Sequence, residues 1–213
     1  RRPGVDPHIV VSQVAGRPSR STSCLITAAA SSPAADCAHS KATATGGGRR
    51  SSISTGDGPL GAAGIQDMLK GIPYWPYTHL VTAVGTGTTM AGLIQGALPY
   101  QQIIGIPVLN NQDSILQEIR GLLTTKDLEK KYRILPQYTF GGYAKKTPEL
   151  IDFMNQTYQT VKLPLDFVYT AKAFYGLRQY LQTAELSGDS RILFLQTGGL
   201  QGNRSLPPGT LCY

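Results

Sequence analysis

The stretch that decides the fold is Val84–Gly96, which reads VGTGTTMAGLIQG. It follows the run Thr78–Val84, THLVTAV, whose β-branched residues are typical of a strand. Glycines and threonines then form a turn at Gly85–Thr89, and Met90–Ala97 has the composition of the first turns of a helix. The order of strand, turn and helix predicts one βα unit of an α/β protein.

The turn between strand and helix has the residue types of a phosphate-binding site. Glycine allows a backbone to approach a ligand closely, and the N–H groups at a helix start, together with threonine hydroxyls, can bind an anion. No Lys-Ser or Lys-Thr follows the glycines, which excludes a P-loop, and Gly85, Gly87 and Gly92 do not fit the dinucleotide-binding spacing. Phosphate binding and an ordinary tight turn both remain open. If phosphate binds at this turn, a bulky side chain introduced at Gly87 should fill the place of the phosphate and abolish its binding.

Outward from this unit, the chain from Pro59 alternates helix and strand signals at short spacing. Further strands are expected at Gln102–Leu109, Tyr132–Phe140 and Arg191–Gln196. Helices are expected at Pro59–Lys70, Ser114–Leu123 and Thr170–Leu181, and another begins at Pro148. Asp113 is the expected N-cap of the helix at Ser114–Leu123, and Thr147 is the expected N-cap of the helix that begins at Pro148. This alternation predicts an α/β fold, a mainly parallel sheet with helices on both faces. Because ligands of such sheets bind beyond the carboxyl ends of the strands, the turns after Val84, Leu109 and Gln196 should share one rim.

The composition divides the chain into two predicted parts. Residues 1–55 are irregular and rich in Ser, Ala, Thr, Gly and Arg, apart from the strand-like His8–Ser12, and residues 56–213 form the α/β domain. The first 50 residues hold seven basic and two acidic groups, so most of the net charge of +7 lies there. The α/β part is close to neutral and shows no clustered basic face, so we expect no nucleic-acid partner.

Other bulk features exclude further classes. No apolar run reaches the roughly 18 residues of a membrane span, and the chain start does not resemble a signal peptide, so we expect no membrane association. The three cysteines (Cys24, Cys37 and Cys212) match neither a disulfide framework nor a zinc pattern, which favours the reducing cytoplasm. The histidines lack ligand spacing, so no metal site is expected, and His79, inside a strand, is interpreted as structural.

Four segments in order resemble one enzyme family. They are Gly58–Ala62 (GPLGA), Gly85–Thr89 (GTGTT), Asp166–Lys172 (DFVYTAK) and Leu193–Gly199 (LFLQTGG). Together they are similar to the C-terminal portion of the 1-aminocyclopropane-1-carboxylate deaminase and D-cysteine desulfhydrase family. The resemblance implies a tryptophan synthase β-like fold (fold type II), the cofactor pyridoxal phosphate, and a small amino acid as substrate. A homodimer is compatible with this class.

The resemblance also implies roles for individual residues. Gly85, Thr86, Gly87, Thr88 and Thr89 correspond to the loop that binds the cofactor phosphate, and Thr197 to the residue that hydrogen-bonds the pyridine nitrogen. Tyr169 corresponds to a tyrosine that faces the substrate, where a phenol can act in proton transfer. Each has a structural alternative: Tyr169 as a core tyrosine and Thr197 as a turn residue.

Two departures from the family pattern bear on activity. The lysine that links the cofactor, in a Gly-Asn-Lys motif, is absent, and neither Lys41 nor Lys172 stands in that context. Gln196 replaces the usual histidine before Thr197. Two functions are therefore retained as hypotheses: a pyridoxal-phosphate-dependent deaminase or desulfhydrase that is incomplete in this chain, and a catalytically silent, truncated relative that keeps the fold and a phosphate site.

Overall fold

The computed structural model describes residues 8–13, 58–183, 186 and 189–213. Most of the segment 1–55, which we expected to be irregular, lies outside these residues. The strand-like run near its start forms β1 (His8–Gln13). The division into 1–55 and 56–213 therefore stays a prediction.

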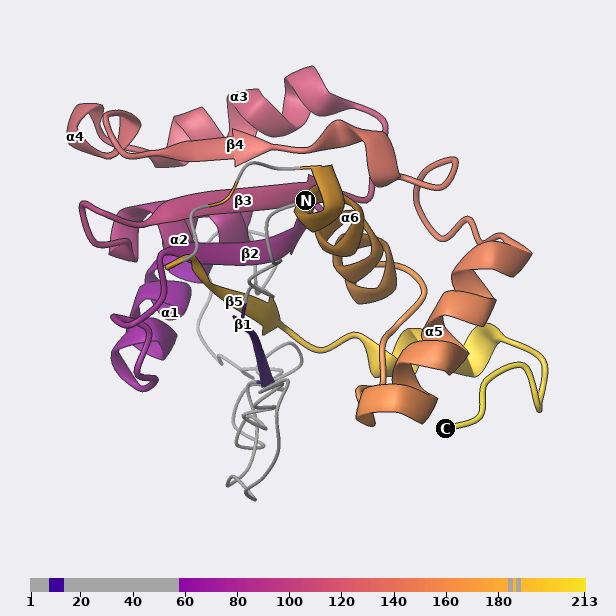
Figure 1. Ribbon diagram of the computed structural model, residues 1–213. Coiled ribbons are helices and arrows are strands. Elements are labelled where there is room, and N and C mark those ends of the chain that lie inside the picture. The colour runs from indigo at the N-terminus through magenta and orange to yellow at the C-terminus, as the bar shows by residue number, and fades with distance from the viewer. Residues whose placement is uncertain (1–7, 14–57, 184–185, 187–188) are drawn as a thin grey trace, which may run out of the picture.

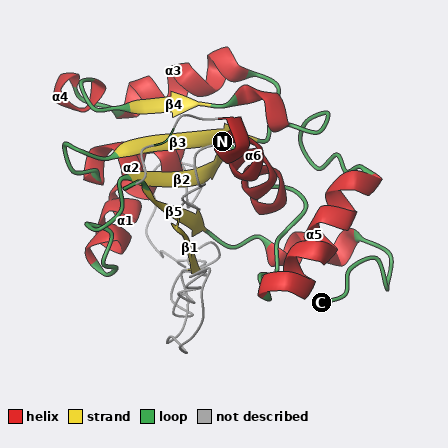
Figure 2. Cartoon of the chain, in the orientation of Figure 1, coloured by secondary structure: helices red, strands yellow, loops and turns green. Residues whose placement is uncertain are grey.

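The described residues form a five-stranded sheet in the order β1-β5-β2-β3-β4, and every neighbouring pair is parallel. Figure 1 shows the strands at the centre with helices around them, and Figure 2 shows the same arrangement by element type. The remaining strands are β2 (His79–Val84), β3 (Gln102–Pro107), β4 (Tyr132–Ile134) and β5 (Arg191–Gln196). The helices are α1 (Pro59–Lys70), α2 (Thr88–Gly96), α3 (Gln112–Leu122), α4 (Thr125–Leu128), α5 (Pro148–Val161) and α6 (Thr170–Thr183), with short 3₁₀ turns η2 (Pro136–Tyr138) and η3 (Leu200–Ser205).

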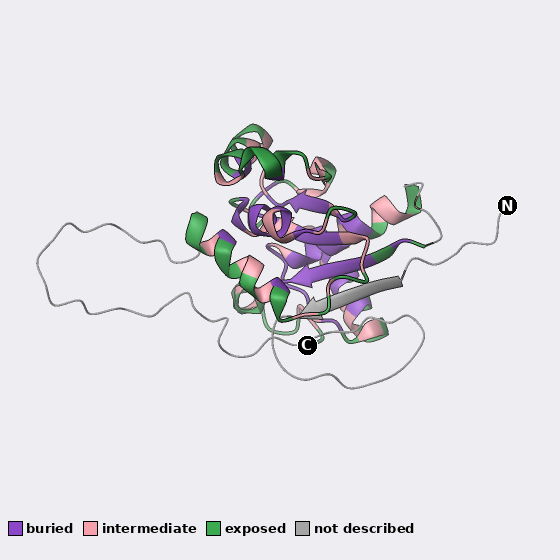
Figure 3. Cartoon of the chain, turned by 90° about the vertical axis from the view of Figure 1, so that its left-hand side faces the viewer, coloured by how far each residue is buried: buried purple, intermediate pink, exposed green. Residues whose placement is uncertain are grey.

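Two apolar clusters sandwich the sheet because successive strand residues point to opposite faces. Val81 and Ile104 belong to the cluster under α5 and α6, whereas Leu80 and Ile103 belong to the cluster under α2 and α3. Buried residues run through the central strands and the helix faces turned towards them (Figure 3). The predicted class, a parallel α/β sheet covered on both faces, is confirmed.

The order of the strands places a reversal between β2 and β5. From β2 the chain passes through α2 to β3 and through α3 to β4, so each new strand is added on the same side. β5 instead pairs with the other side of β2, with Thr82 opposite Leu195. The carboxyl ends of β2 and β5 thus diverge into separate connections, which is where open α/β sheets bind ligands.

The predicted elements are present, with corrections at two of the boundaries described here. Asp113 is not the N-cap of α3: Asn111 holds that position and Asp113 lies in the first turn. The strand expected over Tyr132–Phe140 ends at Ile134, because Pro136 starts the 3₁₀ turn η2 and has no N–H for a sheet bond. The predicted cap of α5 is confirmed, since the Thr147 side chain accepts from Leu150 N at 3.2 Å.

Candidate cofactor site

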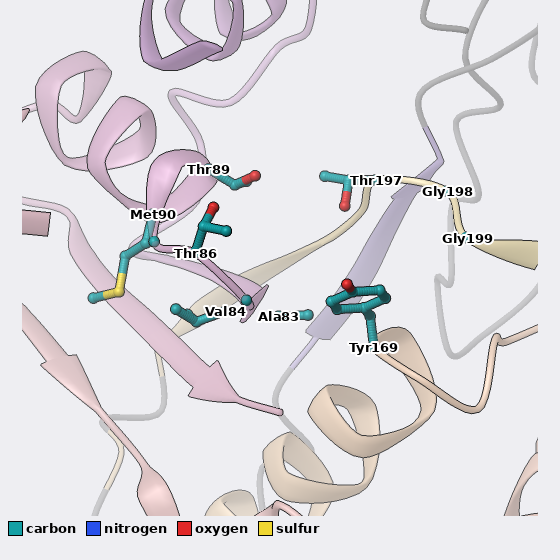
Figure 4. Close-up of a pocket in the computed structure, with 11 residues that line it drawn as sticks. Ala83, Val84, Thr86, Thr89, Met90, Tyr169, Thr197, Gly198 and Gly199 are labelled. Carbon is teal, nitrogen blue, oxygen red and sulfur yellow. The ribbon is translucent and has the colours of Figure 1, made fainter. Parts of the chain in front are cut away.

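A pocket of about 350 Å³ lies where β2 and β5 diverge. Its walls come from the turn after β2, the start of α6 and the turn after β5. Figure 4 shows Thr86 and Thr89 on one side of the pocket, Thr197 on another, and the Tyr169 ring below them. The lining residues are Ala83, Val84, Gly85, Thr86, Gly87, Thr89, Met90, Tyr169, Thr197, Gly198 and Gly199.

We call Gly85–Thr89 the phosphate turn. Gly87 is the N-cap of α2 in the left-handed conformation (φ 95°), which glycine adopts without steric cost. Ala91 N donates to Gly87 O at 2.9 Å, so the N–H groups of residues 88–90 precede the helical bonding pattern. These N–H groups and the positive end of the helix dipole favour an anion beside the turn.

The threonines of this turn do not all face the pocket. Thr86 and Thr89 line it, whereas the buried Thr88 accepts a hydrogen bond from Gly58 N at 3.2 Å and so ties α2 to the start of α1. The hydroxyls of Thr86 and Thr88 are 3.3 Å apart. Thr88 can therefore contribute its backbone to an anion, while its side chain holds the two helix starts together.

The two glycines of the turn face opposite ways, which corrects the expectation for Gly87. A Cβ at Gly87 would meet Ile119 Cγ1 of α3 at 2.6 Å, so a side chain there would enter the core and leave the anion's place empty. A Cβ at Gly85 would instead lie 3.2 Å from Cε1 of Tyr169, inside the pocket wall. Gly85 is thus the position at which a side chain narrows the pocket.

Tyr169 is held at the pocket by a buried carboxylate. Asp166 accepts hydrogen bonds from the backbone N–H groups of Val168, Tyr169 and Thr170 at 3.0, 2.7 and 2.9 Å, and from Thr170 Oγ1 at 2.6 Å. Asp166 is fully buried and caps the start of α6. The sequence signal for this cap is an Asp four residues before a helix-starting Thr, which we did not interpret as a positioning feature.

The turn after β5 forms the third wall. Gly198 and Gly199 have φ of 102° and 101°, and a Cβ at Gly199 would lie 2.9 Å from Cγ of Asp166, so the turn packs on the residue that caps α6. Gln196, which stands where the resemblance implies a histidine, is buried and donates from Nε2 to Pro164 O at 2.6 Å. Gln196 therefore anchors the segment before α6, and Thr197 is the residue of this turn whose hydroxyl faces the pocket in Figure 4.

Two further residues near the pocket, Tyr143 and Lys172, had no role in the site assigned from the sequence. The exposed Tyr143 packs edge-on against Tyr169, with ring centroids 6.0 Å apart and planes at 70°. Lys172, in the first turn of α6, is fully buried and donates to Thr139 O at 3.0 Å and Gly142 O at 2.5 Å. Burial lowers the pKa of Lys172 to about 8, partly opposed by the negative charge of Asp166.

No group of three or more His, Cys, Asp or Glu residues within the described part of the chain could hold a metal ion. No helix of that part of the chain is long and apolar enough to cross a membrane. His79 lies in β2 with Nδ1 2.8 Å from Thr78 Oγ1, and burial lowers the pKa of its imidazole, as expected for a structural histidine.

The arrangement defines a class: a parallel α/β protein with a glycine- and threonine-rich turn, at a helix start, where its strand order reverses. Comparison with known proteins shows which proteins the chain is similar to. The chain is 35% identical over 133 residues to a Pyrococcus abyssi protein named "Putative 1-aminocyclopropane-1-carboxylate deaminase", covering 58% of this chain and 39% of that protein. It is 28% identical over 137 residues to an Arabidopsis thaliana protein named "Bifunctional D-cysteine desulfhydrase/1-aminocyclopropane-1-carboxylate deaminase, mitochondrial". This match covers 59% of this chain and 33% of that protein.

A solved structure shows the same similarity. A crystal structure described as an ACC deaminase homologue matches with a TM-score of 0.54 and 29% identity, covering 68% of this chain and 48% of that chain. No family model matches the sequence. The chain is a homologue of the 1-aminocyclopropane-1-carboxylate deaminase and D-cysteine desulfhydrase family over its C-terminal portion, and that family is generally dependent on pyridoxal phosphate. The chain spans half or less of the length of these relatives.

Proposed function

We propose that the pocket binds pyridoxal phosphate, with the phosphate on the phosphate turn at the start of α2. The observation that carries the proposal is the place of this turn: it follows β2 at the point where the strand order reverses, and Gly87 opens a helix whose N–H groups face the pocket side. The 58–62 and 85–89 segments that resemble the family meet here, because Thr88 accepts from Gly58 N.

The groups that line the pocket suit this cofactor. Neither a carboxylate nor a lysine stands among the described lining residues, so the positive end of α2 is not offset by an acidic side chain of the wall. The hydroxyls of Thr86 and Thr89 can donate to a phosphate, and Thr197 lies on the far side, where it can face the pyridine ring. Val84 and Met90 also line the pocket, but their buried side chains pack around Gly105 in the core beneath it.

We propose a deaminase or desulfhydrase reaction on a small amino acid of the 1-aminocyclopropane-1-carboxylate or D-cysteine class. The bound cofactor would supply an electron sink for a carbanion at the substrate. Thr197 would hold the pyridine nitrogen with a neutral hydroxyl, which leaves that nitrogen largely unprotonated. Tyr169 would face the substrate and transfer a proton through its phenol, its backbone fixed by Asp166.

A second candidate function follows from the lysines. The family reaction needs a lysine at the cofactor, and the buried Lys172 has its Nζ on the carbonyls of Thr139 and Gly142. The alternative is therefore a catalytically silent relative that binds the cofactor without turnover. Borohydride reduction of the chain with pyridoxal phosphate, followed by peptide mapping, separates the two. One stoichiometrically labelled lysine would support the enzyme, and no labelled lysine would support the silent relative.

The binding proposal is tested by the glycine that faces the pocket. In Gly85→Val the side chain meets the Tyr169 ring, and overpacking of about 1–3 kcal/mol should weaken pyridoxal phosphate binding about 10- to 100-fold. The matched control is Gly121→Val in α3, where a Cβ meets no atom within 4 Å. Affinity is measured by absorbance titration. Equal affinities of the Gly85→Val variant and the unaltered chain would exclude this pocket as the cofactor site.

Residues 56–213 would form the cofactor-binding domain under this proposal. A small amino acid as the substrate partner, the absence of nucleic-acid and membrane partners, a homodimer and a cytoplasmic location remain predictions. Sedimentation of the purified chain with and without pyridoxal phosphate would test the homodimer directly.

A further inference from the structure

Lys172 is a buried cation with backbone acceptors. Its side chain is fully buried, and Nζ reaches across 33 and 30 residues to the carbonyls of Thr139 and Gly142. The ion pairs found within the described residues are Lys70–Asp67 and Lys130–Asp127, so Lys172 is not part of one there. A buried charge is costly unless it is hydrogen-bonded. The two carbonyl bonds, together with the nearby negative charge of Asp166, therefore stabilise the buried ammonium group of Lys172 in this conformation.

The segment that Lys172 holds, residues 139–144, is here called the tyrosine loop. Four residues of this loop have a positive φ: Gly141 and Gly142 have φ of 87° and 112°, and the non-glycine residues Phe140 and Ala144 have φ of 51° and 52°. A left-handed conformation costs about 1–2 kcal/mol at each residue that carries a Cβ. The loop therefore needs contacts from elsewhere in the fold to keep this path.

The tyrosine loop carries Tyr143 to the pocket. Its ring lies edge-on against Tyr169, which lines the pocket, and Tyr169 stands three residues before Lys172 at the start of α6. Gly142 is also confined on its other side, because a Cβ there would lie 3.3 Å from Nδ2 of Asn110. One helix turn thus presents Tyr169 to the pocket and clamps the loop that supplies its neighbouring ring.

We propose that Lys172 is a positioning residue that clamps the tyrosine loop and thereby sets Tyr143 against Tyr169 at the pocket. Lys172 acts through Tyr143 and does not touch the ligand. The inference deepens the proposed function, because the importance of the clamp for binding rests on the pocket being the cofactor site. The clamp itself belongs to the unliganded chain and can be measured without any ligand.

The first test uses amide hydrogen exchange on the whole chain. Lys172→Met keeps the length of the side chain and removes its donors. The matched control is Lys130→Met, because Lys130 Nζ makes the same kind of bonds, to Ile94 O and Gln95 O at 2.8 and 2.7 Å, away from the pocket. Exchange over residues 139–145 should rise about tenfold or more in Lys172→Met, the scale of losing hydrogen bonds to a charged donor, and stay unchanged in Lys130→Met.

The second test asks whether Lys172 acts through Tyr143. Pyridoxal phosphate affinity is measured for Lys172→Met, Tyr143→Ala and the double variant. Lys172→Met should weaken binding in the unaltered background and have no further effect when Tyr143 is already Ala. Lys172→Gln, which retains an amide donor, should recover part of the affinity and of the exchange protection, and it replaces Lys172→Met if that variant does not fold.

The outcomes separate the two proposals. If the unaltered chain does not bind pyridoxal phosphate, the proposed function fails, while local exchange over 139–145 still decides on the clamp. Equal amide exchange over residues 139–145 in Lys172→Met and in the unaltered chain would overturn the clamp. So would a rise in exchange that is uniform over the whole chain and equal to the rise in Lys130→Met, because such a rise reports a general loss of stability. Additive effects of Lys172→Met and Tyr143→Ala on affinity would overturn the route through Tyr143.

Discussion

The phosphate turn and the tyrosine loop reach neighbouring parts of the site by different physical means. The phosphate turn joins two elements that follow each other in the chain, β2 and α2, and its left-handed residue is Gly87. The tyrosine loop has left-handed residues with side chains, Phe140 and Ala144, and is held by Lys172, 30 or more residues further along. The first geometry is local, whereas the second exists only in the folded molecule.

The difference teaches where a substitution acts. A change in the phosphate turn meets tightly packed neighbours, since a Cβ at Gly87 would overlap α3. A change in the tyrosine loop meets solvent on one side, because Tyr143 and Ala144 are exposed. We therefore expect the turn to respond through the stability of the whole fold, and the loop through local order at the pocket.

The largest effect is expected for Gly87→Val. A left-handed valine and its overlap with Ile119 should together lower the free energy of unfolding by about 2–5 kcal/mol. The control is Gly209→Val, because Gly209 has φ of 79° but open space around its Cβ, so it carries the strain without the overlap. Denaturant unfolding measures both. An equal loss of unfolding free energy in the two variants would show that α3 shifts to accommodate the side chain at residue 87. The contrast between the phosphate turn and the tyrosine loop would then weaken.

A smaller and purely chemical effect is expected for Tyr169→Phe, at the junction of the two regions. Removal of the phenol oxygen should lower turnover of the amino-acid substrate about 10²-fold if Tyr169 transfers a proton, with cofactor affinity unchanged. Tyr74→Phe is the control, because its hydroxyl donates to Gly96 O at 3.1 Å away from the pocket. A core role for Tyr169 would instead show as a lower melting temperature with the rate preserved.

The smallest effect concerns the pH dependence that Lys172 contributes to stability. Its pKa is 10.5 when exposed and about 8 in the fold, so the unfolded chain binds more protons between these values. Stability of the unaltered chain should therefore rise with pH relative to Lys172→Met, by about 1 kcal/mol from pH 8 to 9. Below pH 7 both states are protonated and the difference should be flat. If the stability of the unaltered chain relative to Lys172→Met instead fell above pH 8, the description of Lys172 as a buried cation would be contradicted.

Much of the fold could be predicted because its signals are short in range. The apolar periodicity of Pro59–Lys70, the Thr147-Pro148 start of α5 and the β-branched run before Gly85 each depend on a few neighbouring residues. The cap of α3 was misplaced because Asn111 and Asp113 are both favourable cap residues two positions apart. The length of β4 was overestimated because its pattern does not show where pairing with β3 ends.

The sequence by itself determined the βα order, the glycine turn and the residues that resemble the family, because backbone preferences and apolar periods act within a few residues. Only the tertiary structure decided that Gly87 faces α3 while Gly85 faces the pocket. It also decided that Lys172 is buried on the loop that holds Tyr143. These relations join segments far apart in the chain, and their direction is set by how the helices pack on the sheet, which no local pattern encodes.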